Sequence, residues 1–186
     1  MTNETTDTQV VIAWAGPTGL MLAREPRLGG VEVLVLERLP EPRTVESRAG
    51  GLPIRTMETL DQRGVLEPFL ERGRRRPSVH FAGIPLDLSA VATRHPFLLI
   101  ITQSEVERIL AERTVESGAQ IRRGAELAGF TQDETGVTVD LTDGLRVRGL
   151  PRRLRRRPQH RTPGRANRLS RPSGNDDRHA RRRPSG

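Results

Sequence analysis

VVIAWAGPTG, from Val10 to Gly19, joins an apolar segment directly to a glycine-containing turn. The apolar residues predict a buried strand, and Pro17 suits the first turn of a following helix because its missing N–H costs nothing there. Gly16 and Gly19 occupy the third and sixth positions of the pattern G-x-G-x-x-G, whereas Trp14 stands at the first position. The stretch therefore predicts a strand, a tight turn and a helix, with one glycine of the pattern missing.

The residues that follow complete a β-α-β unit. We expect a helix over 17–29, closed by two glycines, and a second buried strand over 31–37 that ends in Glu37, 21 positions after Gly16. Pro26 is expected to disturb the helix, at a cost of roughly 3 kcal/mol. In such a unit the glycines let the backbone approach a diphosphate at the helix N-terminus, and the acid accepts hydrogen bonds from ribose hydroxyls. The context predicts a dinucleotide site; the alternative is a glycine-rich turn without a ligand.

The rest of the body alternates between helical and strand patterns up to residue 149. A capping box at Ser104–Glu107 is expected to open one of the helices. The turns 132–135 and 143–144 are expected to join three strands into consecutive hairpins. The expected elements are helices over 53–63, 65–71 and 104–117, strand and loop material over 77–101, and strands over 121–122, 125–131, 136–141 and 145–149.

Charge divides the chain into two unlike parts. The formal net charge is +8, but residues 151–186 hold 13 Arg against Asp176 and Asp177, so this tail carries +11 and the other residues carry 8 − 11 = −3. The tail has too few apolar residues to form a core, so we expect it to be disordered. A basic tail also suggests an Arg-rich nucleic-acid-binding protein. The tail lacks aromatic residues on which bases would stack, so we expect no specific nucleic-acid partner.

Other functional classes find little support in the composition. The chain has no cysteine, which excludes disulfides and thiolate metal sites. The four histidines are not clustered, so we expect neither a metal site nor a catalytic acid or base. The polar N-terminus and the short apolar runs predict neither a signal peptide nor a membrane span. We therefore expect a cytoplasmic protein without a membrane partner, and its oligomeric state stays open.

Several segments together resemble one protein family. They are GPTGLMLA (16–23), RLGGVEVLVLERLPEP (27–42), ESRAGGL (46–52), RTMETLDQRG (55–64), QSEVERILAE (103–112), GAQIRRG (118–124) and GVTVDLTDG (136–144). They resemble the FAD-dependent aromatic hydroxylases of the p-hydroxybenzoate hydroxylase fold, class A flavoprotein monooxygenases, and within them the actinomycete branch that acts on polyketide antibiotics or rifampicin. The resemblance implies an α/β fold: an incomplete Rossmann-like, GR2-type FAD-binding domain with a β-meander over 1–149. Residues 77–101 would begin the sheet of a substrate domain, and 150–186 would be the disordered tail.

The resemblance also implies which residues contact the cofactor. Glu37 would hold the adenosine ribose, Arg48 would reach the flavin side and the phosphates, Gln103 would touch the ribitol chain, and the backbone of Leu127 would meet the adenine. Taken alone, Arg48 and Gln103 would be read as polar surface residues. The implied FAD contacts are Ala15, Gly16, Pro17, Thr18, Gly19, Glu37, Arg38, Arg48, Gln103 and Leu127.

The family chemistry belongs to the cofactor. NADPH reduces the flavin, which then uses O₂ to hydroxylate a small, electron-rich, polyketide-like aromatic substrate, while the protein binds, orients and excludes water. A flavin-free scaffold built on the same β-α-β unit is the remaining alternative. Trp14 departs from the family, which has glycine at this position because a side chain there would crowd the turn and the cofactor.

The resemblance stops at residue 149, and the genetic code suggests why. The family continues with a strand and turn of the type YLVGCDGGRSTVR in one-letter code, whereas this chain reads LPRRLRRRPQHRT over 150–162. Read one base late, the codon of Leu150 (CTN, followed by C) allows TAC for tyrosine, and each arginine codon CGN allows GNC for valine, glycine or aspartate. Codons compatible with residues 150–162 can therefore encode the whole family segment in the shifted frame. We therefore expect a frameshifted tail and an inactive fragment whose first strand keeps an exposed edge.

The reading-frame hypothesis makes a direct prediction about the gene. The nucleotide sequence from codon 145 onward should encode the family continuation in an alternative frame, as determined by sequencing that region. If no frame encodes it, the basic tail is a genuine extension and needs its own explanation.

Overall fold

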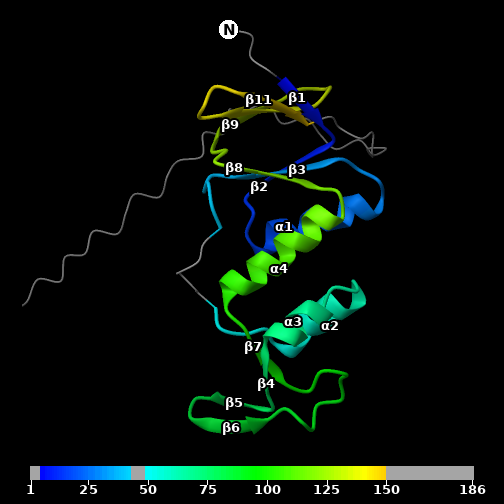
Figure 1. Cartoon of the computed structure of the whole chain (residues 1–186), viewed down its shortest axis with the longest axis vertical. Helices are drawn as coiled ribbons and strands as arrows, with labels where there is room; N and C mark the ends of the chain where they lie inside the picture. The colour runs from blue at the N-terminus through cyan, green and yellow to red at the C-terminus, as the bar shows by residue number, and fades with distance from the viewer. Residues whose placement is uncertain (1–4, 43–48, 150–186) are drawn as a thin grey trace, which may run out of the picture.

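The computed structural model describes residues 5–42 and 49–149, in which three layers are stacked (Figure 1). Helices form the first layer and a parallel sheet of order β2-β3-β8 the second; a mixed sheet of order β1-β11-β10-β9 forms the third. The predicted α/β fold is thereby confirmed. The elements are α1 (Pro17–Leu28) and α4 (Gln103–Glu116) in the helical layer, β2 (Val10–Ala13), β3 (Val33–Glu37) and β8 (Gln120–Arg123) in the parallel sheet, and β1 (Thr5–Thr8), β9 (Leu127–Gln132), β10 (Val137–Leu141) and β11 (Arg146–Gly149) in the mixed sheet.

Strand β3 holds the layers together because both of its faces are buried. Val33 and Val35 pack into the cluster formed with α1 and α4. Leu34 and Leu36 pack instead against residues of the mixed sheet. A strand covered on both sides is expected to be apolar at every position, which explains the run VLVL. The polar exception, Glu37, lies at its end, where the site is formed.

Helix α1 begins at Pro17 as predicted and passes through Pro26, contrary to the expected disturbance. Pro26 lies in the last turn, so its missing N–H removes a single helical hydrogen bond close to the helix end. Its carbonyl oxygen accepts bonds from the N–H groups of Gly29 (3.0 Å) and Val31 (3.1 Å). The helix therefore ends one residue early, at Leu28, instead of breaking.

Helix α4 packs along α1, and its cap differs from the predicted one. Thr102 is the N-cap, and its hydroxyl oxygen accepts a hydrogen bond from the N–H of Glu105 at 3.3 Å. The pattern T-x-x-E begins two residues before the S-x-x-E that we expected to cap the helix, so Ser104 lies inside the first turn. On the buried side, the hydroxyl of Thr114 lies 3.1 Å from the carbonyl oxygen of Leu20 in α1 and 2.7 Å from that of Leu110.

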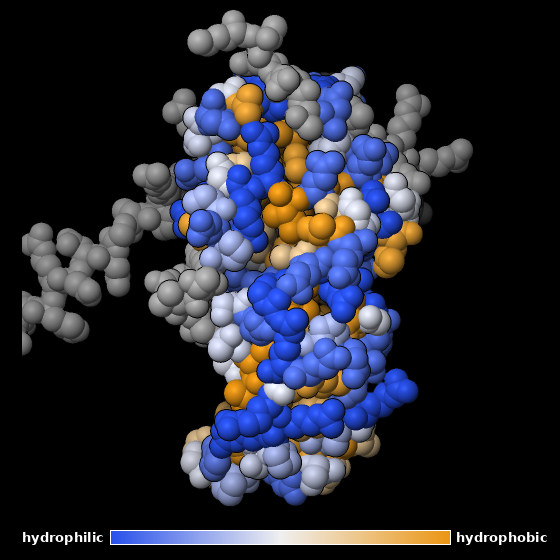
Figure 2. Space-filling view, in the orientation of Figure 1, coloured by the Kyte–Doolittle hydropathy of each residue, from blue (hydrophilic) through white to orange (hydrophobic). Residues whose placement is uncertain are grey.

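The other end of the molecule is built from short elements (Figure 1). Two small antiparallel sheets, β4 with β7 and β5 with β6, follow two helices. The β5–β6 hairpin leaves Phe81, Ile84 and Leu86 exposed, and Figure 2 shows hydrophobic surface among hydrophilic surface on the face that it draws. The assignment of 77–101 to a substrate domain stays a prediction. The elements are α2 (Ile54–Gln62), α3 (Glu67–Arg72), β4 (Arg74–Arg76), β5 (Ser78–Phe81), β6 (Ile84–Asp87) and β7 (Leu98–Ile100).

One strand was not predicted: β1 pairs in parallel with β11. The predicted tail over 150–186 lies outside the described residues. Strand β2 pairs only with β3 among the strands that the structure describes, which leaves its other edge open in residues 5–42 and 49–149. None of the helices described there is long and apolar enough to cross a membrane.

The contact between α1 and α4 is testable through Thr114, whose side chain is fully buried. Thr114→Val keeps the shape but removes the hydroxyl, so we expect the free energy of unfolding to fall by about 1 kcal/mol, measured by urea denaturation. Thr131→Val, at an exposed position on β9, is the matched control and should change stability much less. Equal effects of the two substitutions would contradict a specific role for this hydrogen bond.

Candidate functional site

The turn between β2 and α1 is held by backbone contacts to β3. The N–H of Trp14 donates to the carbonyl oxygen of Leu36 at 2.7 Å. Gly16 is the N-cap of α1, and no side chain caps this end of the helix. Because Pro17 has no N–H, the amides of the first turn begin with Thr18. The arrangement presents uncapped N–H groups and the positive end of the helix dipole at the turn.

Gly19 is required by a close approach of the backbone. A Cβ atom at this position would lie 2.0 Å from the carbonyl oxygen of Trp14. No side chain fits in that space, so Gly19 allows the strand and the first helical turn to pack together. This is the role that the sixth position of the glycine pattern predicts.

Trp14 carries a backbone conformation that glycine would adopt without strain. Its φ is +110°, one of two positive values at non-glycine residues in the described part of the chain. For a residue with a side chain this region costs on the order of 1–3 kcal/mol. The turn therefore holds Trp14 in a conformation that glycine adopts more readily.

Glu37 is the polar group at the centre of the site. The residue is buried, with 7% of its surface exposed. One carboxylate oxygen accepts a bond from the N–H of Ala15 at 3.0 Å, and the other accepts from the N–H of Leu39, also at 3.0 Å. A carboxylate offers about four acceptor positions, so this side chain can fix the turn and still accept hydrogen bonds from a ligand.

A pocket of about 320 Å³ opens beside this carboxylate. It brings together three of the residues implied by the family resemblance: Glu37, Arg38 and Leu127. The sequence also singled out Trp14, as a side chain that would crowd the cofactor, but it did not indicate Ala13, Leu36, Ala125 or Glu126. The full lining is Ala13, Trp14, Leu36, Glu37, Arg38, Ala125, Glu126 and Leu127.

Ala15, Gly16 and Gly19 lie in the adjacent turn, where the N–H of Ala15 donates to Glu37, whereas the remaining implied residues lie elsewhere or outside the described residues. Gln103 begins α4; its backbone N–H donates to the carbonyl oxygen of Ala49 at 3.1 Å, and its side-chain amide donates to Glu107 at 2.7 Å. Arg48 lies outside the described residues. Pro17 and Thr18 face a second pocket, between α1, α2 and α4.

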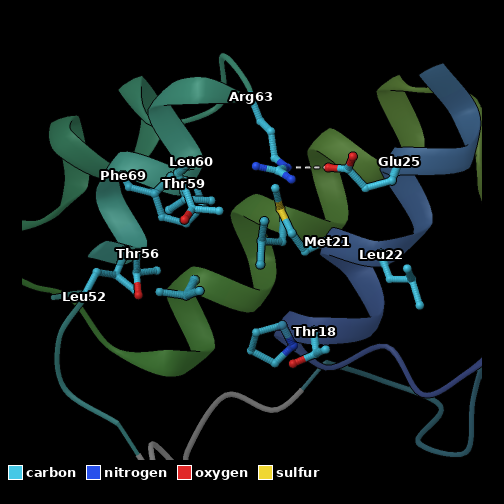
Figure 3. Close-up of a pocket in the computed structure, with 13 residues that line it drawn as sticks. Thr18, Met21, Leu22, Glu25, Leu52, Thr56, Thr59, Leu60, Arg63 and Phe69 are labelled. Atoms are coloured by element: carbon cyan, nitrogen blue, oxygen red, sulfur yellow. Dashed lines mark hydrogen bonds and ion pairs between the residues drawn. The ribbon is translucent and has the colours of Figure 1, made fainter. Parts of the chain in front are cut away.

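The second pocket is larger, about 430 Å³, and mostly apolar. Figure 3 shows Met21 reaching from α1 into the space between the helices, with the ion pair of Arg63 and Glu25 at one side. Apart from this pair, its lining offers only hydroxyl side chains as polar groups. Its chemistry suits apolar contact better than a diphosphate. No group of three histidine or acidic side chains in residues 5–42 and 49–149 is placed to hold a metal ion.

Comparison with known proteins establishes the family. Residues 7–150, more than half of the chain, match the family model described as an FAD binding domain. The chain belongs to this FAD-binding family, whose relatives include monooxygenases that act on rifampicin and tetracycline-type compounds.

The relatives are much longer than the matched region. A rifampicin monooxygenase of Streptomyces venezuelae is 50% identical over 141 residues, which cover 75% of this chain and 29% of that protein. A 12-dehydrotetracycline 5-monooxygenase/anhydrotetracycline 6-monooxygenase of Streptomyces rimosus is 49% identical over 135 residues, covering 72% and 27%. The solved structure of the anhydrotetracycline hydroxylase OxyS from Streptomyces rimosus superposes with a TM-score of 0.72 at 44% identity, covering 78% and 30%. The chain thus spans about 30% of the length of these proteins.

The packing of the turn is testable at Gly19. Gly19→Ala places a methyl group against the carbonyl oxygen of Trp14, so we expect a loss of about 1–3 kcal/mol in the free energy of unfolding, measured by urea denaturation. Gly129→Ala is the control, since a Cβ there meets nothing within 4 Å. If Gly19→Ala were as stable as this control, the close approach of strand and helix would be refuted.

Proposed function

We propose that the described residues form the adenosine end of an FAD site in a flavin-dependent aromatic monooxygenase. One observation carries the proposal: the buried carboxylate of Glu37 lies at the end of β3, beside a pocket that Arg38 and Leu127 also line. The membership in the FAD-binding family supports it. In this proposal Glu37 accepts hydrogen bonds from the ribose hydroxyls with the acceptor positions that Ala15 and Leu39 leave open.

The other residues take their roles from the sequence resemblance. We assign the backbone from Ala15 to Gly19 to the diphosphate, Arg48 to the flavin side, and Gln103 to the ribitol chain. When bound, FAD supplies the redox chemistry that transfers an oxygen atom from O₂ to an aromatic ring. The chain's own residues bind and orient the cofactor.

For the whole protein we propose NADPH as the reductant, a polyketide-like aromatic compound as the substrate, and the cytoplasm as the location. Relatives named for rifampicin and anhydrotetracycline support this substrate class. The chain spans about 30% of their length, so these statements concern the whole protein. Nothing in the comparisons supports the nucleic-acid-binding alternative.

Recognition of the ribose can be tested without changing the protein. Trp14 is the only tryptophan, and the chain has no tyrosine, so its fluorescence reports on the pocket that it lines. We expect adenosine to change this fluorescence saturably. We expect 2′,3′-dideoxyadenosine to bind at least about tenfold more weakly, because it cannot donate hydrogen bonds to a buried carboxylate. Equal binding of the two nucleosides would contradict the role of Glu37.

A pair of variants locates the binding. Ala13→Leu fills the pocket and should abolish the adenosine signal, whereas Ala128→Leu, at an exposed position on β9, should leave it unchanged. Circular dichroism checks that both variants are folded. An unchanged signal in folded Ala13→Leu would place the nucleoside elsewhere and overturn the proposed site.

A further inference from the structure

Trp14 touches both the nucleoside pocket and the turn beside the diphosphate-binding amides. The side chain lines the pocket that contains Glu37. The same indole lies across Gly16, since a Cβ on that glycine would be 3.3 Å from the indole Nε1 and 3.6 Å from Cε2. Trp14 is 67% exposed, so most of its side chain faces solvent at the mouth of the pocket.

A bound diphosphate requires direct access to the backbone amides at this turn. Its oxygens must come within hydrogen-bond distance of the backbone amides at the turn and the first helical residues. An indole resting on Gly16 occupies space on the approach to those amides and offers a largely apolar surface to a charged group. The carboxylate of Glu37 at the adenosine end can accept hydrogen bonds from a ribose, whereas the indole of Trp14 lies close to Gly16 at the diphosphate end.

We propose that Trp14 closes the diphosphate end, so that this chain takes an adenine nucleoside but discriminates against its diphosphate derivatives, ADP and FAD. The inference rests on the proposed adenosine pocket and adds the ligand class that the pocket accepts. It assigns the discrimination to one side chain. In this proposal Trp14 does not block Glu37 or the backbone near Leu127, which contact the nucleoside.

The test compares three ligands in three proteins. Isothermal titration calorimetry gives the Kd of adenosine, ADP and FAD for the wild type, Trp14→Gly and Trp14→Ala. In the wild type we expect ADP and FAD to bind more weakly than adenosine. In both variants we expect the ratio of the Kd of ADP to that of adenosine to fall at least tenfold, and the ratio of the Kd of FAD to that of adenosine to fall with it.

The two variants distinguish the effect of the indole ring from the effect of the strained backbone at Trp14. Both remove the indole, but only Trp14→Gly relieves the positive φ. We therefore expect both to admit the diphosphate and only Trp14→Gly to raise the thermal unfolding midpoint. The unfolding measurement also shows that the variants are folded.

Three results would overturn the inference. If the wild type and both variants share one Kd ratio, Trp14 is no barrier, and the adenosine pocket stands. If the variants lose affinity for ADP, the indole N–H is a phosphate donor, and the sign of the effect is reversed. If adenosine binds to none of the three proteins, the proposed function fails, and the inference fails with it.

Discussion

The burial of β3 on both faces is the constraint on which the other features depend. Helices cover Val33 and Val35, and the mixed sheet covers Leu34 and Leu36, so the strand has one register in which all four side chains leave water. This register places Glu37 at the end of the strand, next to the turn that follows β2. The carboxylate then accepts bonds from Ala15 and from Leu39, and thereby fixes the chain on both sides of the site. Hydrophobic layering thus determines where the polar group lies.

Much of this arrangement could be predicted from the sequence because it is local. The stretch from Val10 to Glu37 combines short apolar runs with glycine and proline at the turn, and these local signals predict strand, turn, helix and strand in that order. Strand β1 could not be predicted, since the polar segment TTDT becomes a strand only by pairing with β11, more than 130 residues away in sequence. The cap of α4 was placed two residues late because two S/T-x-x-E patterns overlap there, and only packing decides between Thr102 and Ser104. The pocket itself could not be predicted, since residues from β2, β3 and the β8–β9 region meet there through tertiary packing that spacing in the sequence does not reveal.

At Trp14 the turn forms although the first glycine of the pattern is missing. The backbone keeps a φ of +110° at a position where the pattern asks for glycine, because the hydrogen bond from Trp14 to Leu36 and the contact with Gly19 fix the turn from both sides. The fold thus tolerates a strained backbone at Trp14. Under the proposal that Trp14 closes the diphosphate end, a chain of an FAD-binding family would keep the family architecture while one side chain changes which ligands the site binds.

The central claim is that the carboxylate of Glu37 and the pocket beside it recognise the ribose of an adenine nucleoside. The most direct measurement is a two-dimensional ¹H–¹⁵N spectrum of the labelled chain during an adenosine titration, because the amides of Ala15 and Leu39 donate to that carboxylate. We predict saturable shifts of these two amides and of those at 125–127, with none in the β5–β6 hairpin. Shifts confined to other parts of the chain, or none at all, would contradict the account.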